Sequence, residues 1–155
     1  MQIRELYYHG KKKKTGEWVT GHLLETCLAR YIVTGSSQTL HTGQFTVTTH
    51  EIIPESLGLC TGYFDRDDYY VYEGDILEHP VNPLMNLVVL WDVKSVGIVV
   101  HPFKDGVVDT SVTYRLNELV GSVTEEYGET RARLVSRVVG KYIDVVGESN
   151  GNTPA

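Results

Sequence analysis

Short segments in which apolar and polar residues alternate run along most of the chain. In residues 43–49, for example, Phe45 and Val47 alternate with glutamine and threonine, which gives a period of two and one apolar face. Valine, isoleucine, threonine and tyrosine dominate such segments, and these residues suit a pleated, half-buried surface. Clusters of Gly, Asn, Asp or Pro separate the segments, as turns separate strands. The pattern therefore predicts a mainly β chain.

The individual strands and turns follow from the same pattern. Asp105-Gly106 is a hairpin signal, and the lysine run at residues 11–14 predicts a solvated hairpin tip because four like charges repel one another. Pro54 cannot donate a ladder hydrogen bond and predicts a strand edge or loop. Turns are predicted at residues 35–38 and 104–106, and strands at residues 2–8, 16–24, 39–41, 43–49, 69–77, 87–92, 96–103, 131–139 and 141–147.

Two segments show helical rather than strand spacing. Residues 22–31 carry an apolar stripe at helical spacing, but they have no N-cap and run directly into a β-branched segment. Both a short helix and a strand–loop–strand arrangement are therefore retained for them. Residues 115–121 place Leu116 and Leu119 on one side of a predicted short helix, with Gly121 as its stop. We expect at most one or two short helices in all.

Length and charge limit the classes of protein that fit. The chain has 155 residues, which favours one domain, predicted over residues 1–147 with a loose tail at 148–155. The formal net charge of −6 argues mildly against a broad phosphate-binding surface. No apolar run approaches the ~18 residues of a membrane span, and no signal-peptide core is visible. We therefore expect a cytoplasmic protein without a membrane partner.

Metal, nucleotide and thiol chemistry find little support in the sequence. An EF-hand loop opening at Asp65 would need Gly and Glu where Tyr70 and Ile76 stand, and the six histidines lack metal-ligand spacing. Gly-rich phosphate loops are absent. Cys27 and Cys60 belong to no Cys-x-x-Cys pair and are predicted to be small buried apolar residues, with a disulfide between them left open. Neither a metal nor a cofactor is predicted.

A basic stripe is the best candidate for contact with nucleic acid. Strand alternation puts Arg131, Arg133 and Arg137 on one face, where they either bind phosphates or form a solvated face paired with the nearby glutamates. The same alternation puts Glu73 and Asp75 on one face of another strand. Nucleic acid is an expected partner only if this stripe binds phosphates.

Four blocks in a fixed order carry a resemblance to a known family. They are GEWVTG at residues 16–21, PESLGLCTGYFDRDDYYVYEGDIL at 54–77, VLWD at 89–92 and the apolar closing segment at 143–147. Together they resemble the YopX family of phage and prophage proteins. Asp67-Asp68 stands where the family has Asn-Gly, and the family's closing motif is reduced at residues 146–154. The matching positions in the central block are Pro54, Glu55, Leu57, Gly58, Thr61, Gly62, Asp65, Tyr72, Glu73, Gly74, Asp75 and Ile76.

The resemblance implies a YopX-like fold of strongly bent antiparallel sheets. The Glu73-Gly74-Asp75 step is also similar to small SH3-like barrels, so we expect an SH3-like element in which Gly74 marks a bulge or bend and Asp75 binds backbone amides. The residues of the central block are interpreted first as fold-setting and second as a binding surface. The candidate binding residues are Asp65, Tyr72, Glu73, Gly74, Asp75 and Trp91.

Three classes of function are compatible with these patterns. The favoured one is a phage- or prophage-encoded, non-catalytic binding or adaptor protein that acts on a host or phage protein in the bacterial cytoplasm. The second is a nucleic-acid-associated accessory protein, and the third, an enzyme, is not favoured because no catalytic spacing is present. Exposed β-sheet edges need covering, so a homo-oligomer is also expected.

Overall fold

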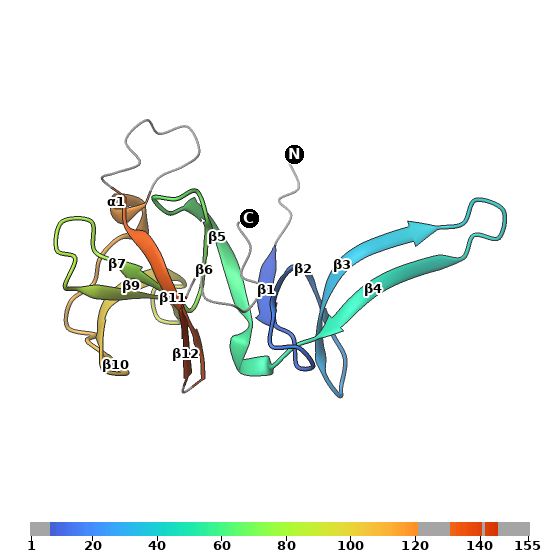
Figure 1. The fold of residues 1–155 in the computed structure, drawn as a ribbon, viewed down its shortest axis with the longest axis horizontal. Helices are drawn as coiled ribbons and strands as arrows, with labels where there is room; N and C mark the ends of the chain where they lie inside the picture. Colours follow the sequence, from blue (N-terminus) through green and yellow to red (C-terminus); the bar gives the residue numbers. More distant parts are fainter. Residues whose placement is uncertain (1–6, 121–130, 141, 146–155) are drawn as a thin grey trace.

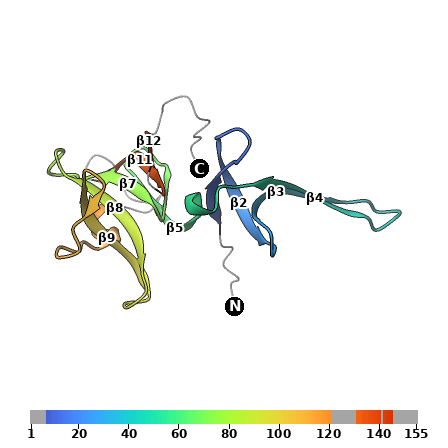
Figure 2. The same cartoon turned by 90° about the horizontal axis from the view of Figure 1, so that it is seen from below.

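The chain is mainly β. The computed structural model describes residues 7–120, 131–140 and 142–145, whose strands form two antiparallel sheets of six strands each (Figures 1 and 2). Helical structure in this part is limited to a 3-10 turn, η1 (Pro54–Ser56), and a single α-helical turn, α1 (Leu116–Leu119). Neither is long or apolar enough to cross a membrane. The prediction of a mainly β fold with one or two short helices is confirmed.

The first sheet is built from the N-terminal part of the chain in the order β4-β3-β2-β1-β5-β6. β1 and β2 form a hairpin whose tip carries Lys13 and Lys14 in exposed positions, as predicted, whereas Lys11 belongs to β1 and is half-buried. Its strands are β1 (Tyr8–Lys11), β2 (Trp18–Glu25), β3 (Arg30–Gln38), β4 (Phe45–Glu51), β5 (Gly58–Phe64) and β6 (Tyr70–Tyr72).

The second sheet has the order β10-β9-β8-β7-β11-β12. Asp105 and Gly106 both have positive φ in the turn between β9 and β10, which is the hairpin that the Asp-Gly signal predicts. The strands are β7 (Asp75–Glu78), β8 (Asn86–Asp92), β9 (Gly97–Lys104), β10 (Val107–Val108), β11 (Arg133–Val139) and β12 (Tyr142–Val145).

The main hydrophobic core belongs to the second sheet. Leu77, Leu87, Val89 and Val100 point from its strands toward the apolar side of α1, where they are fully buried. Val71 of β6 joins the same core, so the first sheet also contributes to it. The first sheet is thereby fixed to the second at its β5–β6 end and leaves its opposite end, at β4, without such support.

The chain crosses from one sheet to the other through a two-residue turn. Glu73 donates its backbone N–H to Leu59 of β5 at 2.9 Å, in the first sheet. Gly74, with φ at +92°, donates to Val89 of β8 at 2.7 Å and accepts from Val138 of β11 at 2.9 Å, both in the second sheet. This turn is therefore bonded to both sheets and sets how they meet.

At the far end of the first sheet, β3 and β4 leave the body as a two-stranded ribbon (Figure 1). β3 pairs with β2 as far as Val33 and has a register shift between Val33 and Gly35. Beyond the shift, the only described partner of β3 is β4. Every residue from 34 to 48 is exposed. We call residues 34–48 the arm.

Several sequence predictions need correction around the arm. The turn predicted at residues 35–38 is part of β3, and the strand predicted at 39–41 lies in the tip of the hairpin. Gly and Ser residues favour turns locally, but cross-strand pairing with β4 holds them extended. Residues 22–31 adopt the strand–loop–strand alternative. The first strand begins at Tyr8, which is the last residue of the predicted range, and residues 1–6 lie outside the described part.

The strand predicted over residues 69–77 is also wrong as a single element. It is split at Glu73-Gly74 into β6 and β7, which belong to different sheets, so Glu73 and Asp75 do not share one strand face. The sequence predicted a bulge or bend at Gly74, and the structure has a turn there. The SH3-like element and the single domain over residues 1–147 stay predictions, and the tail at 148–155 lies outside the described residues.

Candidate functional site

The Asp65 carboxylate organises a tight loop and ties it to the second sheet. Its Oδ1 accepts the backbone N–H groups of Asp67 at 2.9 Å and Tyr69 at 2.8 Å, and its Oδ2 accepts that of Leu134 on β11 at 2.7 Å. The side chain is fully buried. Burial raises the pKa of Asp65, and the three backbone donors counteract that shift. These bonds account for a structural role.

Asp75 forms a buried ion pair with Arg137 at the junction of the two sheets. Arg137 Nε lies 3.2 Å from Asp75 Oδ1, and Asp75 Oδ2 accepts the backbone N–H of Tyr72 at 2.9 Å. Both side chains are almost completely buried. Burial raises the pKa of Asp75 to about 7, while Arg137 and the Tyr72 N–H favour its ionised form. Asp75 thus bonds to Tyr72 on the other side of the Glu73-Gly74 turn and to Arg137 on β11.

Aromatic rings from the first sheet cover this ion pair. The Arg137 guanidinium lies 5.5 Å from the centre of the Trp18 ring and 5.9 Å from that of Tyr72, which is cation–π geometry. His9 stacks on Tyr72 with a centroid distance of 4.2 Å. Burial, together with the charge of Arg137, holds the pKa of His9 well below its usual value. A neutral imidazole in this position packs as an aromatic ring.

The predicted binding residues are therefore divided between the interior and the surface. Asp65, Tyr72 and Asp75 are buried, and Glu73 is half-buried with its pKa raised by burial. Trp91, on β8, is 45% exposed. The structure thus brings most of the set together around one turn, and a contact of these residues with a partner stays a prediction.

The predicted arginine stripe does not form a common exposed face. Arg137 is buried against Asp75, and Arg131 is buried with its Nη2 at 3.6 Å from Asp68. Arg133 is exposed and binds Glu78 at 2.8 Å. Simple alternation fails here because β11 has a register shift between Leu134 and Ser136 and because Arg131 precedes the strand. The nearby glutamates considered as partners of the stripe, Glu125, Glu126 and Glu129, lie outside the described residues.

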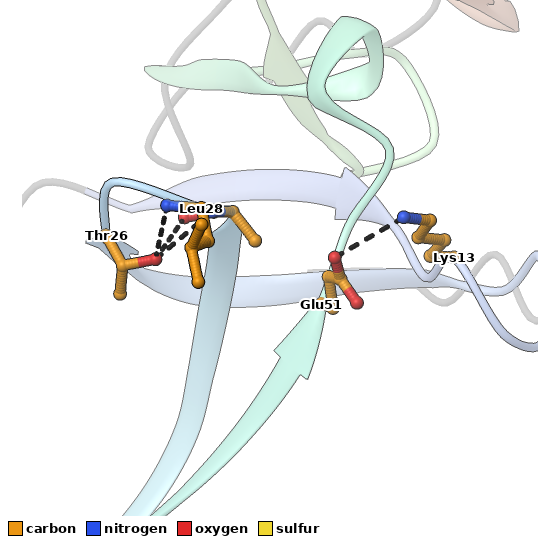
Figure 3. Close-up of polar contacts among 5 residues, drawn as sticks. Lys13, Thr26, Leu28 and Glu51 are labelled. Atoms are coloured by element: carbon orange, nitrogen blue, oxygen red, sulfur yellow. Dashed lines mark hydrogen bonds and ion pairs between the residues drawn. The ribbon is translucent and has the colours of Figure 1, made fainter.

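The lysine run is partly neutralised by acids. Lys12 lies 3.5 Å from Glu17 within the hairpin, and Lys13 lies 3.5 Å from Glu51 at the end of β4. Figure 3 shows the second contact, in which the Lys13 side chain points toward Glu51 at the end of β4. Because both pairs are partly exposed, we expect each to contribute little to stability. Lys12 and Lys13 thus share their charges with acids.

The two cysteines are free and differ in exposure. Cys27 is exposed in the turn between β2 and β3, whereas Cys60 is half-buried on β5. The prediction of a buried side chain is wrong for Cys27. Thr26 shapes that turn, because its hydroxyl accepts the backbone N–H groups of Leu28 at 3.2 Å and Ala29 at 3.1 Å (Figure 3). β3 begins directly after Ala29.

A cleft of about 890 Å³ opens beside β9 and includes residues of β5 and of the loop before α1. Its wall carries opposite charges, with Asp92 at the end of β8 and with Lys94 and Arg115. The Nδ1 atom of His101 lies 2.8 Å from the Val112 carbonyl oxygen, and this contact orients the ring. Asp92 binds its own turn through Ser95. Asp92 and His101 are thus engaged in local hydrogen bonds.

The arm has a composition unlike that of the rest of the chain. Residues 31–50 contain no Asp, Glu, Lys or Arg, although 22% of the whole chain is charged. Its exposed apolar side chains include Leu40 at 96%, Phe45 at 65% and Val47 at 39% exposure. The sequence interpretation missed this feature, and the twenty-residue gap in charge was the signal that could have found it.

Comparison with known proteins leaves the family open: no family model matches the chain, and no curated protein or solved structure matches it significantly. The YopX-like family assignment stays a prediction. Among the described residues, no group of three or more His, Cys, Asp or Glu side chains is placed to hold a metal ion.

Proposed function

We propose that the chain is a non-catalytic protein-binding module, or adaptor, that contacts its partner through the arm. The observation that carries this proposal is a run of fifteen consecutive exposed residues in a two-stranded ribbon, with both of its faces open to solvent. An isolated two-stranded hairpin is marginally stable in water. A ribbon that projects from the body without a core of its own is therefore best explained as an element completed by another protein.

The chemistry of the arm favours a protein over a nucleic acid. A surface that binds phosphates needs cations, and the arm has none. Threonine, serine and glutamine side chains with a few exposed apolar groups, and a free strand edge, instead suit β-strand addition, in which main-chain hydrogen bonds supply the affinity. The buried carboxylates of the central block support the non-catalytic part of the proposal. The oxygens of Asp65 and Asp75 accept hydrogen bonds from backbone N–H groups, and Asp75 also accepts one from Arg137.

The phage setting and the location in the bacterial cytoplasm rest on the resemblance to the YopX family alone. A phage origin and a cytoplasmic location are both compatible with an adaptor function. A phage-encoded adaptor would meet its partner, from host or phage, in that compartment.

The test is an affinity capture with a shortened arm. A tagged chain is compared with a variant in which residues 34–48 are replaced by Asn-Gly, a two-residue turn that closes the hairpin between the paired residues Val33 and Thr49. The lysate comes from infected cells that also express an untagged copy. We expect a protein recovered in stoichiometric amount with the full chain and lost with the shortened one.

The control removes charge instead of the arm. A Lys13→Ser, Lys14→Ser variant changes the hairpin tip, and we expect it to capture the same protein as the unmodified chain. Capture that survives shortening of the arm would refute the proposal. Recovery of nucleic acid that depends on the lysines and weakens steeply with salt would favour the nucleic-acid function instead.

A further inference from the structure

The outer edge of β4 has the features of an unprotected sheet edge. β4 is the terminal strand of its sheet, so alternate residues direct backbone N–H and C=O groups away from β3, and among the described residues none of them from Phe45 to His50 is met by another strand. Natural edge strands usually carry lysine, proline or a bulge that blocks pairing with other chains. The β4 sequence FTVTTHE has neither lysine nor proline.

The bonds at the base of the arm show where this open edge stops. The backbone N–H of Lys13 bonds to the Glu51 carbonyl at 2.9 Å, and Ile52 forms a bridge with Lys12. The edge is therefore covered by the β1–β2 hairpin at Glu51 and becomes open from His50 outward. The free length is that of an average strand, which is enough for pairing.

From these observations we infer that the partner of the arm is a second copy of the chain, bound by antiparallel pairing of the two β4 edges about a two-fold axis. The inference rests on the proposed function of the arm and names its partner. A two-fold contact places the same surface of two identical chains together. Two copies of a chain with a net charge of −6 repel each other. This electrostatic repulsion is smallest where they touch through the segment that has no charged residues.

The β4 sequence is compatible with pairing to itself. With Val47 on the axis, Phe45 of one copy lies opposite Thr49 of the other, and Thr46 lies opposite Thr48. Cross-strand pairs of threonine with threonine and of aromatic with β-branched residues are favourable, and this register places no charged residue opposite another. The result is a four-stranded sheet with the order β3-β4-β4-β3, which exceeds the three strands that an independent sheet needs.

The other free edge of the arm is less suited to the contact. Past Val33, β3 also lacks a described partner on its outer side, but its sequence there is Gly-Ser-Ser-Gln. These residues have low β-propensity, whereas the Phe, Val and Thr residues of β4 have high β-propensity. The register shift between Val33 and Gly35 also bends β3 at the point where a partner strand would begin. The choice of β4 over β3 makes the inference testable within one ribbon.

The experiment measures the mass of the purified full chain in solution by size-exclusion chromatography with light scattering. We expect the unmodified chain at twice its 17.4 kDa and Val47→Lys, which sets two lysines against each other on the axis, at the single mass. Ser37→Lys adds the same charge to β3 in the same arm and should leave the dimer intact. Circular dichroism verifies that both variants are folded, as their exposed positions predict.

Each other outcome overturns the inference. An unmodified chain that runs as a monomer refutes it, as does a dimer that Val47→Lys leaves intact or that both variants dissociate equally. The capture experiment with the shortened arm tests the proposed function separately. If the purified chain is monomeric while the arm still captures a different protein from lysate, the second copy is wrong and the adaptor function stands. If the shortened arm captures everything that the full arm does, the function fails as well.

Discussion

At the scale of residues, stability is concentrated in polar groups at the meeting point of the two sheets. Asp65 and Asp75 are both fully buried, and both accept backbone N–H groups that would otherwise be unpaired. A buried polar group without a partner costs more free energy than a made hydrogen bond contributes. Single substitutions at this junction should therefore be costly although none of these residues belongs to the apolar core.

Substitution of Asp75 by alanine should destabilise the fold by about 3–5 kcal/mol, because the buried guanidinium of Arg137 loses its carboxylate counter-ion. Chemical denaturation measures the loss. Glu78→Ala is a matched control, since Glu78 also pairs β7 with β11, through the exposed Arg133, and should cost about 0–1 kcal/mol. Equal losses in the two variants would contradict the structural role of the buried pair.

His9 should make the fold less stable in mild acid. Folded His9 stays neutral because its pKa is lowered by burial and by Arg137, whereas unfolded His9 binds a proton below its usual pKa of 6.5. The unfolded state then holds more protons, so this contribution to the free energy of unfolding falls as the pH falls below about 6.5.

The contribution of His9 is isolated by comparison with His9→Phe, which keeps an aromatic ring. We expect the stability difference between the unmodified chain and the variant to shift in favour of the variant as the pH is lowered from 7 to 5. Asp75 acts in the opposite direction, because its raised pKa favours the folded state as the pH falls from about 7 toward 3.8. A difference that does not change with pH would contradict a neutral, buried His9.

At the scale of elements, the arm depends on how closely β3 can approach β2. A Cβ atom on Gly21 would lie 2.1 Å from the Val33 carbonyl oxygen, which is an overlap with backbone. This contact is at the last paired position before β3 leaves β2. The absence of a side chain at Gly21 therefore allows the two strands to pair up to the start of the arm.

Gly21→Ala should force β2 and β3 apart and destabilise the first sheet by about 1–3 kcal/mol, the usual range for overpacking. Thermal unfolding followed by circular dichroism measures it. Gly97→Ala serves as the control, because a Cβ there meets no atom within 4 Å and the stability should hardly change. A similar effect of both substitutions would show that the close approach at Gly21 is not what limits the pairing.

The sequence predicted the strands well where short apolar runs enter the core, as in β8 and β9, because runs of this length bounded by turns are typical of buried strands. The prediction failed at residues 35–38, where pairing with β4 overrode a local preference for a turn. It also failed at Glu73-Gly74, where one predicted strand is divided because the chain passes from the first sheet to the second. The burial of Arg137 also required knowledge of the β7–β11 pairing, because an isolated strand gives no sign that its arginine faces an aspartate.

At the scale of the whole molecule, a well-packed body carries a ribbon that has no core. Figure 1 shows the second sheet and the arm at opposite ends of the chain's long axis. Local opening requires less free energy where few apolar groups are buried. The two ends should therefore differ in how readily their backbone amides exchange with solvent.

Hydrogen–deuterium exchange should resolve this difference. In the Val47→Lys variant, amides of residues 34–48 should exchange orders of magnitude faster than those of β8, which lies in the main core. In the unmodified chain, we expect slower exchange in β4, because its outward amides gain partners. Equal protection of the arm and β8 in the variant would contradict a ribbon that lacks internal support.

The exposed turn before β3 gives this molecule a native reporter position. Cys27 is accessible there and Cys60 is half-buried, so a bulky thiol-reactive fluorophore under mild conditions should label the former first. That dye would sit close in sequence to the root of the ribbon and outside the inferred pairing surface. Energy transfer between donor- and acceptor-labelled copies could then follow assembly in real time without an engineered cysteine.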